Sequence, residues 1–150
     1  MALRLAALFF DLGDTLMIEA SEVKNAEETT LYADLIPGMA EALRHFKAQG
    51  HRLALVADSR PDTPPNVLRQ HNLLELFETL AISEVTGATK PDPLIFRVAL
   101  DALAARRSEK NRPNSRLFFA NKWGAALHIH AENEPRWGFS QKNSVSPTGC

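Results

Sequence analysis

Four short apolar runs, separated by segments with helical periodicity, constrain the fold of this chain more than any other feature. The runs are residues 5–10 (LAALFF), 52–57 (RLALVA), 79–83 (TLAIS) and 116–120 (RLFFA). Continuous apolar strands are typical of parallel sheets that helices cover on both faces. The alternation of strand and helix patterns therefore predicts an α/β domain, with a three-layer, Rossmann-like parallel sheet and helices on both faces.

The segments between these runs carry the signals of helix starts and ends. Apolar residues recur at helical spacing within residues 36–51, and Gly50 is placed to end that helix. The proline pair at residues 64–65 is placed to begin a second helix, which we expect to continue to about His71. A third helix is predicted after Pro93, with apolar residues along one face.

Charge and cysteine content narrow the partners and the compartment. A net charge of -1 gives no electrostatic argument for a nucleic acid or an anionic membrane as a partner. The single cysteine, Cys150, excludes a disulfide within these 150 residues, which fits a reducing cytosol. The start of the chain resembles a weak signal peptide, but its apolar run at residues 5–10 is short for a signal core. We therefore predict a cytoplasmic protein without a membrane partner.

Three polar side chains follow directly after predicted strands. They are Asp11, Asp58 and Asn121. Right-handed crossovers place the carboxyl ends of parallel strands on one edge of the sheet, and ligands bind at that edge. We therefore expect these three side chains to converge on one site.

The motifs at these strand ends resemble those of the haloacid dehalogenase (HAD) superfamily of hydrolases. "FFDLGDTL" is similar to its first motif, "LALVADS" to its second and "GATKPDPLIF" to its third, while "RLFFANKWGAA" stands where its fourth belongs. The resemblance implies a HAD-like core domain at residues 1–126. The gaps between the motifs have no room for a large cap domain, so the chain resembles the capless type. We expect residues 127–150 to be an irregular C-terminal segment with a disordered end.

The resemblance implies a phosphatase that forms an aspartyl-phosphate on Asp11. A carboxylate that attacks phosphorus divides one hard step into two easier ones. Lys90 would be the second catalytic residue, because its charge would neutralise the nucleophile and the phosphoryl group. Both residues belong to the motifs quoted above.

The remaining implied roles concern the metal and the substrate. Asp11, the backbone carbonyl of Gly13 and the side chain of Asn121 would hold Mg²⁺, the expected cofactor. Asp58 and Ser59 would bind the substrate, a phosphorylated compound. Asparagine supplies an oxygen without charge, so we expect this site to bind magnesium weakly.

Several motif positions depart from the family pattern. Gly13 stands where the phosphatases usually have a second aspartate as general acid and base, and Asp14 is one residue out of register to replace it. Ala57 stands where a serine or threonine would bind the phosphoryl oxygen. A second hypothesis is therefore a catalytically degenerate HAD-like domain that binds a ligand or a protein. A third is that truncation or an altered reading frame explains the unusual C-terminal segment.

Two further features complete the predictions. A small hairpin within residues 15–33 would be the main cover of an otherwise open site, and an open site makes a homodimer a reasonable expectation. His128 and His130 would lie on one face of a short strand. A His-x-His pair can bind zinc or copper, but it is more often a solvated strand face.

Overall fold

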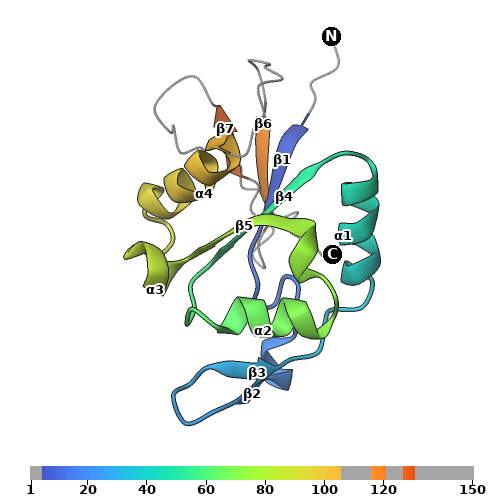
Figure 1. The fold of residues 1–150 in the computed structure, drawn as a ribbon, viewed down its shortest axis with the longest axis vertical. Coiled ribbons are helices and arrows are strands. Elements are labelled where there is room, and N and C mark those ends of the chain that lie inside the picture. Colours follow the sequence, from blue (N-terminus) through green and yellow to red (C-terminus); the bar gives the residue numbers. More distant parts are fainter. Residues whose placement is uncertain (1–4, 106–115, 121–126, 131–150) are drawn as a thin grey trace, which may run out of the picture.

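The computed structural model describes residues 5–105, 116–120 and 127–130, and a five-stranded sheet lies at its centre. The strands of this sheet are β1 (Leu5–Phe10), β4 (Arg52–Ala57), β5 (Phe77–Ile82), β6 (Arg116–Ala120) and β7 (Leu127–His130). Their order is β5-β4-β1-β6-β7 (Figure 1). The first four pair in parallel, as the sequence predicts, whereas β7 pairs antiparallel with β6.

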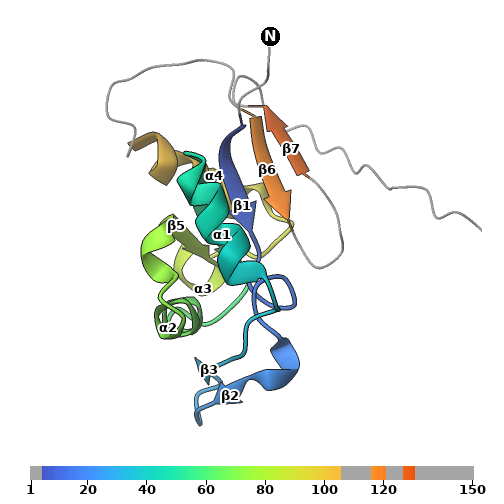
Figure 2. The ribbon, with the colours of Figure 1, turned by 90° about the vertical axis from the view of Figure 1, so that its right-hand side faces the viewer.

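Helices cover both faces of the sheet. The α-helices in the described part of the chain are α1 (Met39–Ala48), α2 (Thr63–Gln70), α3 (Ser83–Thr86) and α4 (Pro93–Ala105). One apolar core packs α1 and α2 against one face, and a second core packs α4 against the other. Figures 1 and 2 show α1 and α4 on opposite sides of the strands. The predicted three-layer α/β architecture is therefore confirmed.

Strand β1 shows why its sequence is apolar throughout. Leu8 and Phe10 belong to the core beneath α1, while Ala7 and Phe9 belong to the core beneath α4. Phe9 is fully buried, because β4 and β6 flank its strand and helices cover both faces. A strand in this central position brings the residue that follows it, Asp11, to the middle of the sheet edge.

Strand β7 is the short strand on which His128 and His130 were expected to lie. The expectation that residues 127–150 as a whole form an irregular segment stays a prediction. The backbone of β7 pairs with β6 in the register Leu117↔Ile129 and Phe118↔His128. This pairing covers the edge that β6 would otherwise present, and an uncovered strand edge is unfavourable. The division of the chain at residue 126 stays a prediction.

A small hairpin is the insertion between β1 and α1. It consists of β2 (Val23–Lys24) and β3 (Thr30–Tyr32), preceded by the 3₁₀ turn η1 (Glu19–Ser21). Thr30 ties the hairpin to α2: its N–H donates to Thr63 Oγ1 at 3.0 Å, and its carbonyl accepts from Asn66 Nδ2 at 3.1 Å. Figure 1 shows the hairpin beside α2, beyond the ends of the sheet strands. No large cap domain occurs among the residues that the structure describes.

The helix boundaries follow the signals in the sequence. Helix α1 lies between Gly38 and Gly50, and both glycines have the positive φ of 86° that suits them at these positions. Helix α2 begins at Thr63, so the proline pair occupies its first turn as predicted. A second 3₁₀ turn, η2 (Leu74–Leu76), leads into β5. In the described ranges, no helix has the length and apolar character that crossing a membrane requires.

Candidate active site

The carboxylate of Asp11 and the ammonium group of Lys90 form the centre of the site. Lys90 Nζ lies 2.7 Å from Asp11 Oδ1, and the two side chains are only 17% and 16% exposed. The backbone N–H of Leu12 donates to the same oxygen at 2.8 Å. These two contacts fix the orientation of the carboxylate and involve Oδ1 rather than Oδ2. Residues 79 positions apart in the sequence are thus joined at the end of β1.

Asp58 holds the other end of Lys90. Its Oδ1 accepts the backbone N–H of Lys90 at 2.9 Å. Asp58 follows β4, the direct neighbour of β1, so the loops after both strands meet at this lysine. Lys90 is therefore anchored through its backbone by one aspartate and paired through its side chain with another.

The loop after β4 is fixed by a buried serine at the start of α3. Ser83 is 7% exposed, and its Oγ accepts the N–H of Ser59 at 3.0 Å. The hydroxyl of Ser59 donates to the carbonyl of Arg60 at 3.2 Å. Ala57, which ends β4, is buried beside this loop and offers no hydroxyl. The position of Ser59 thus depends on α3, a short helix that the sequence did not predict.

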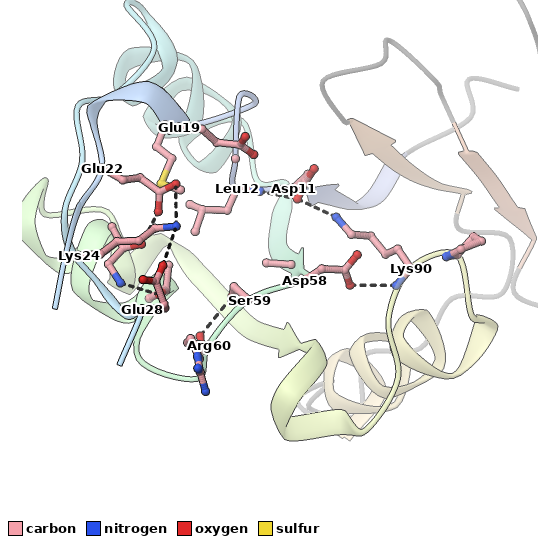
Figure 3. Close-up of a pocket in the computed structure, with 16 residues that line it drawn as sticks. Asp11, Leu12, Glu19, Glu22, Lys24, Glu28, Asp58, Ser59, Arg60 and Lys90 are labelled. Atoms are coloured by element: carbon pink, nitrogen blue, oxygen red, sulfur yellow. Dashed lines mark hydrogen bonds and ion pairs between the residues drawn. The ribbon is translucent and has the colours of Figure 1, made fainter. Parts of the chain in front are cut away.

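A cavity of about 650 Å³ lies between the sheet edge and the hairpin. Figure 3 shows Asp11, Asp58 and Lys90 on one side of it and Glu22, Lys24 and Glu28 on the other. The residues from the sheet edge that line it include Asp11, Gly13, Ala57, Asp58, Ser59 and Lys90. This volume is in the range of small-molecule sites.

The hairpin side of the cavity carries paired charges. Lys24 Nζ lies 3.9 Å from Glu22 Oε1 and 4.0 Å from Glu28 Oε2. The hydroxyl of Thr30 donates to Glu22 Oε2. These contacts lie within the hairpin, so the charges there serve its own structure as well as the cavity wall.

Gly13 and Glu19 meet at the wall of the cavity. A Cβ atom built on Gly13 would overlap with Oε1 of Glu19 and would lie 2.9 Å from its Cδ. Both residues line the cavity, and Figure 3 shows the Glu19 side chain extending from its turn toward Leu12. The carboxylate of Glu19 therefore occupies the space that a side chain at position 13 would enter.

Asp14 fixes the turn that carries Glu19. Its Oδ1 accepts the backbone N–H of Glu19 at 3.0 Å, and its own backbone has a φ of 48°. Asp14 is exposed and does not line the cavity. Asp14 is thus out of register to replace an acid at position 13, as the sequence indicated.

The oxygen atoms at this edge suit a hard cation only in part. The Asp11 carboxylate and the Gly13 carbonyl group are the kind of ligand that Mg²⁺ prefers. No cluster of three His, Cys, Asp or Glu residues that could hold a metal occurs within the described ranges. His128 and His130 lie on β7, and metal binding by this pair stays a prediction that the described side chains do not test.

The structure thus brings together three of the predicted site residues directly: Asp11, Asp58 and Lys90. Gly13 and Ser59 line the same cavity. Asn121 lies outside the described residues, so its predicted place at the site stays a prediction. Sequence reasoning missed Glu19, because only the fold of the turn after β1 brings it back to Gly13.

Comparisons with known proteins agree with this geometry. The haloacid dehalogenase-like hydrolase family profile matches residues 11–110, which include the site residues from Asp11 to Lys90. The chain therefore belongs to the haloacid dehalogenase-like hydrolase family. The family was expected from the motifs, and this expectation is confirmed.

Individual relatives match shorter stretches. A glyceraldehyde 3-phosphate phosphatase of Pyrococcus furiosus is 29% identical over 87 residues, which are 58% of this chain and 36% of that protein. A phosphoglycolate phosphatase of Cereibacter sphaeroides is 33% identical over 78 residues, 52% of this chain and 35% of the relative. The matches thus span about a third of the length of these curated relatives.

A solved structure supports the fold. The crystal structure of a HAD-superfamily hydrolase from Ehrlichia chaffeensis superposes with a TM-score of 0.61 and covers 79% of each chain. The sequence identity is 17%, so this likeness concerns the fold alone.

Proposed function

We propose that this chain is a magnesium-dependent phosphatase that acts through an aspartyl-phosphate on Asp11. The observation that carries the proposal is the 2.7 Å contact between Lys90 Nζ and Asp11 Oδ1 at the wall of a cavity. The family membership and the names of the curated relatives support the same chemistry. The substrate would be a phosphate monoester that enters the cavity between the sheet edge and the hairpin.

In the first step, Oδ2 of Asp11 would attack the phosphorus atom. The new bond joins Oδ2 to phosphorus, and the bond from phosphorus to the ester oxygen breaks. Lys90 would stabilise the negative charge that the phosphoryl oxygens carry in the transition state. In the second step, water would attack the phosphorus atom, release phosphate and restore the Asp11 carboxylate.

Asp58 and Ser59 would support these steps without changing bonds. Asp58 positions Lys90 through its backbone N–H, which keeps the ammonium group beside the nucleophile. Ser59 would donate a hydrogen bond to the phosphoryl group after its hydroxyl leaves the Arg60 carbonyl. Asp11, the carbonyl of Gly13 and Asn121 would hold Mg²⁺, which when bound lowers the charge on the phosphoryl group.

The test compares turnover of an aryl phosphate by the wild type and Asp11→Asn, with Mg²⁺ and with excess EDTA. We expect turnover that requires Mg²⁺ and is lost in Asp11→Asn. Lys90→Met should lower the rate while circular dichroism shows a folded protein. Turnover that survives Asp11→Asn would refute the proposed nucleophile.

A binding function is the second candidate. Phosphatases of this family carry a hydroxyl group where this chain has Ala57 and a carboxylate where it has Gly13. The absence of both groups favours a degenerate site. Such a domain would show no turnover and no heat of Mg²⁺ binding in calorimetry. A cytoplasmic location and a homodimer stay expectations; light scattering of the purified protein would measure the oligomeric state.

A further inference from the structure

The proposed mechanism needs a proton donor, and none of the residues given a role in it so far supplies one. When the ester bond breaks, the leaving oxygen gains a negative charge and requires a proton unless it is already a stable anion. When water later attacks the phosphorus atom, a base has to take a proton from it. A carboxyl group near the nucleophile can serve both steps in turn.

Five carboxylates line the cavity: those of Asp11, Glu19, Glu22, Glu28 and Asp58. Asp11 is the proposed nucleophile, and Asp58 accepts the backbone N–H of Lys90. Glu22 and Glu28 belong to the hairpin, where both pair with Lys24. Figure 3 shows these two on the side of the cavity opposite to Asp11.

Glu19 differs from the others in its position. Its Oε1 occupies the place that a Cβ atom of residue 13 would take, so the carboxylate lies beside the backbone two residues after Asp11. Because Gly13 has no side chain, the cavity wall is open for the glutamate at this point. The glycine thus creates the space that a carboxylate from another part of the chain fills.

The backbone of Glu19 is held in place by its own turn. Its N–H donates to Asp14 Oδ1 at 3.0 Å, and its carbonyl accepts the N–H of Glu22 at 3.1 Å. The preceding residue, Ile18, donates its N–H to the carbonyl of Asp34 at 2.8 Å. These hydrogen bonds fix the point of the turn from which the exposed side chain of Glu19 extends toward Gly13.

We propose that Glu19 is the general acid and base of this site. The protonated carboxyl group gives its proton to the ester oxygen as the bond from that oxygen to phosphorus breaks. The resulting carboxylate then takes a proton from the water molecule that attacks the phosphorus atom. This second transfer restores the protonated acid as phosphate leaves Asp11. The inference rests on the proposed phosphatase function.

The experiment uses two substrates that differ in their need for a proton. The first substrate, phenyl phosphate, has a poor leaving group that requires protonation. The second, dinitrophenyl phosphate, releases dinitrophenolate, which leaves as an anion without protonation. Release of each phenol is followed in the pre-steady state for the wild type, Glu19→Gln, Asp11→Asn and Glu27→Gln. Glu27 is an exposed glutamate of the same hairpin segment outside the cavity lining, so its variant is the matched control.

For Glu19→Gln we expect phenol release to fall by about 10²- to 10⁴-fold, the usual effect of losing a general acid. The variant should still release a rapid burst of dinitrophenolate, close to one equivalent, because the phosphoenzyme forms but is hydrolysed slowly. Glu27→Gln should behave as the wild type, and Asp11→Asn should give no burst.

Three outcomes would overturn the inference. Phenol release at the wild-type rate in Glu19→Gln shows that its carboxylate takes no part. An equal loss of phenol release and of the dinitrophenolate burst shows a role that is not proton transfer. If the wild type releases neither phenol nor dinitrophenolate, the phosphatase function itself is refuted, and with it the role of Glu19. The first two outcomes leave the phosphatase function intact.

Discussion

Replacing Gly13 with alanine should move the Glu19 carboxylate without changing the residue itself. The added Cβ would overlap with Oε1 of Glu19 and come within 2.9 and 3.0 Å of its Cδ and Cγ. The outer part of the glutamate side chain therefore has to move. The backbone can stay, because Gly13 is not among the glycines with a positive φ.

The expected change in stability is small. A glycine-to-alanine substitution at a compatible backbone position stabilises by about 0.4–1 kcal/mol through the unfolded chain. A displaced, off-rotamer glutamate costs roughly 0.5–1.5 kcal/mol. The two terms oppose each other, so the free energy of unfolding should change by less than about 1 kcal/mol. The effect on phenol release should nevertheless approach that of Glu19→Gln.

Gly38→Ala is the matched control. A Cβ there meets no atom within 4 Å, but the φ of 86° is unfavourable for alanine. This variant should lose about 1–2 kcal/mol of stability and keep its activity. Urea unfolding followed by circular dichroism measures the first quantity, and the phenyl phosphate assay measures the second. A loss of more than about 2 kcal/mol in Gly13→Ala, or full activity in that variant, would contradict the argument.

Three further predictions concern the scaffold. Ser83→Ala removes the acceptor of the Ser59 N–H and should cost about 1–3 kcal/mol in urea unfolding; an unchanged midpoint would show that water replaces the hydroxyl. Leu55→Ala removes a fully buried side chain and should cost about 2–5 kcal/mol; a cost under about 1 kcal/mol would refute tight packing around β4. Tyr32, the single tyrosine, donates to Asp34 Oδ1 at 2.6 Å, and this hydrogen bond raises the pKa of its phenol above 10.0. The ultraviolet titration of Tyr32 should therefore have a midpoint above 10.0, which Asp34→Asn should lower, and a midpoint at or below 10.0 would contradict this reasoning. The free energy of unfolding should fall as the pH rises past 10.0, because the folded state keeps the phenol proton to a higher pH than the unfolded chain does.

The layered fold could be predicted from local patterns because the described side chains of β1 and β4 enter the cores on both faces of the sheet. Residues 5–10 and 52–57 read as apolar runs for this reason, and Gly50 has the positive φ that its place after α1 suggested. The strand predicted at residues 79–83 had less accurate bounds, because β5 starts at Phe77 and Ser83 already belongs to α3. A serine at the junction of two elements gives no periodic signal.

The part of the site that lies directly after the strands could be predicted from the sequence. The places of Asp11 and Asp58 follow from topology, and Lys90 was found through its motif. Glu19 could not be found in this way, because a carboxylate that returns to Gly13 through a turn leaves no fixed spacing. The one available signal was a glycine in place of an acid, followed within a few residues by a glutamate.

The central place of β1 has a consequence for synthesis of the protein. The strand is made before both of its neighbours, because β4 and β6 come from later parts of the chain. Until translation has passed Ala120, at least one edge of an apolar strand lacks its final neighbour. Because ribosomes add about 5–20 residues per second, this state lasts for seconds, and such edges aggregate readily. The nascent chain is thus an expected client of chaperones that bind short apolar segments.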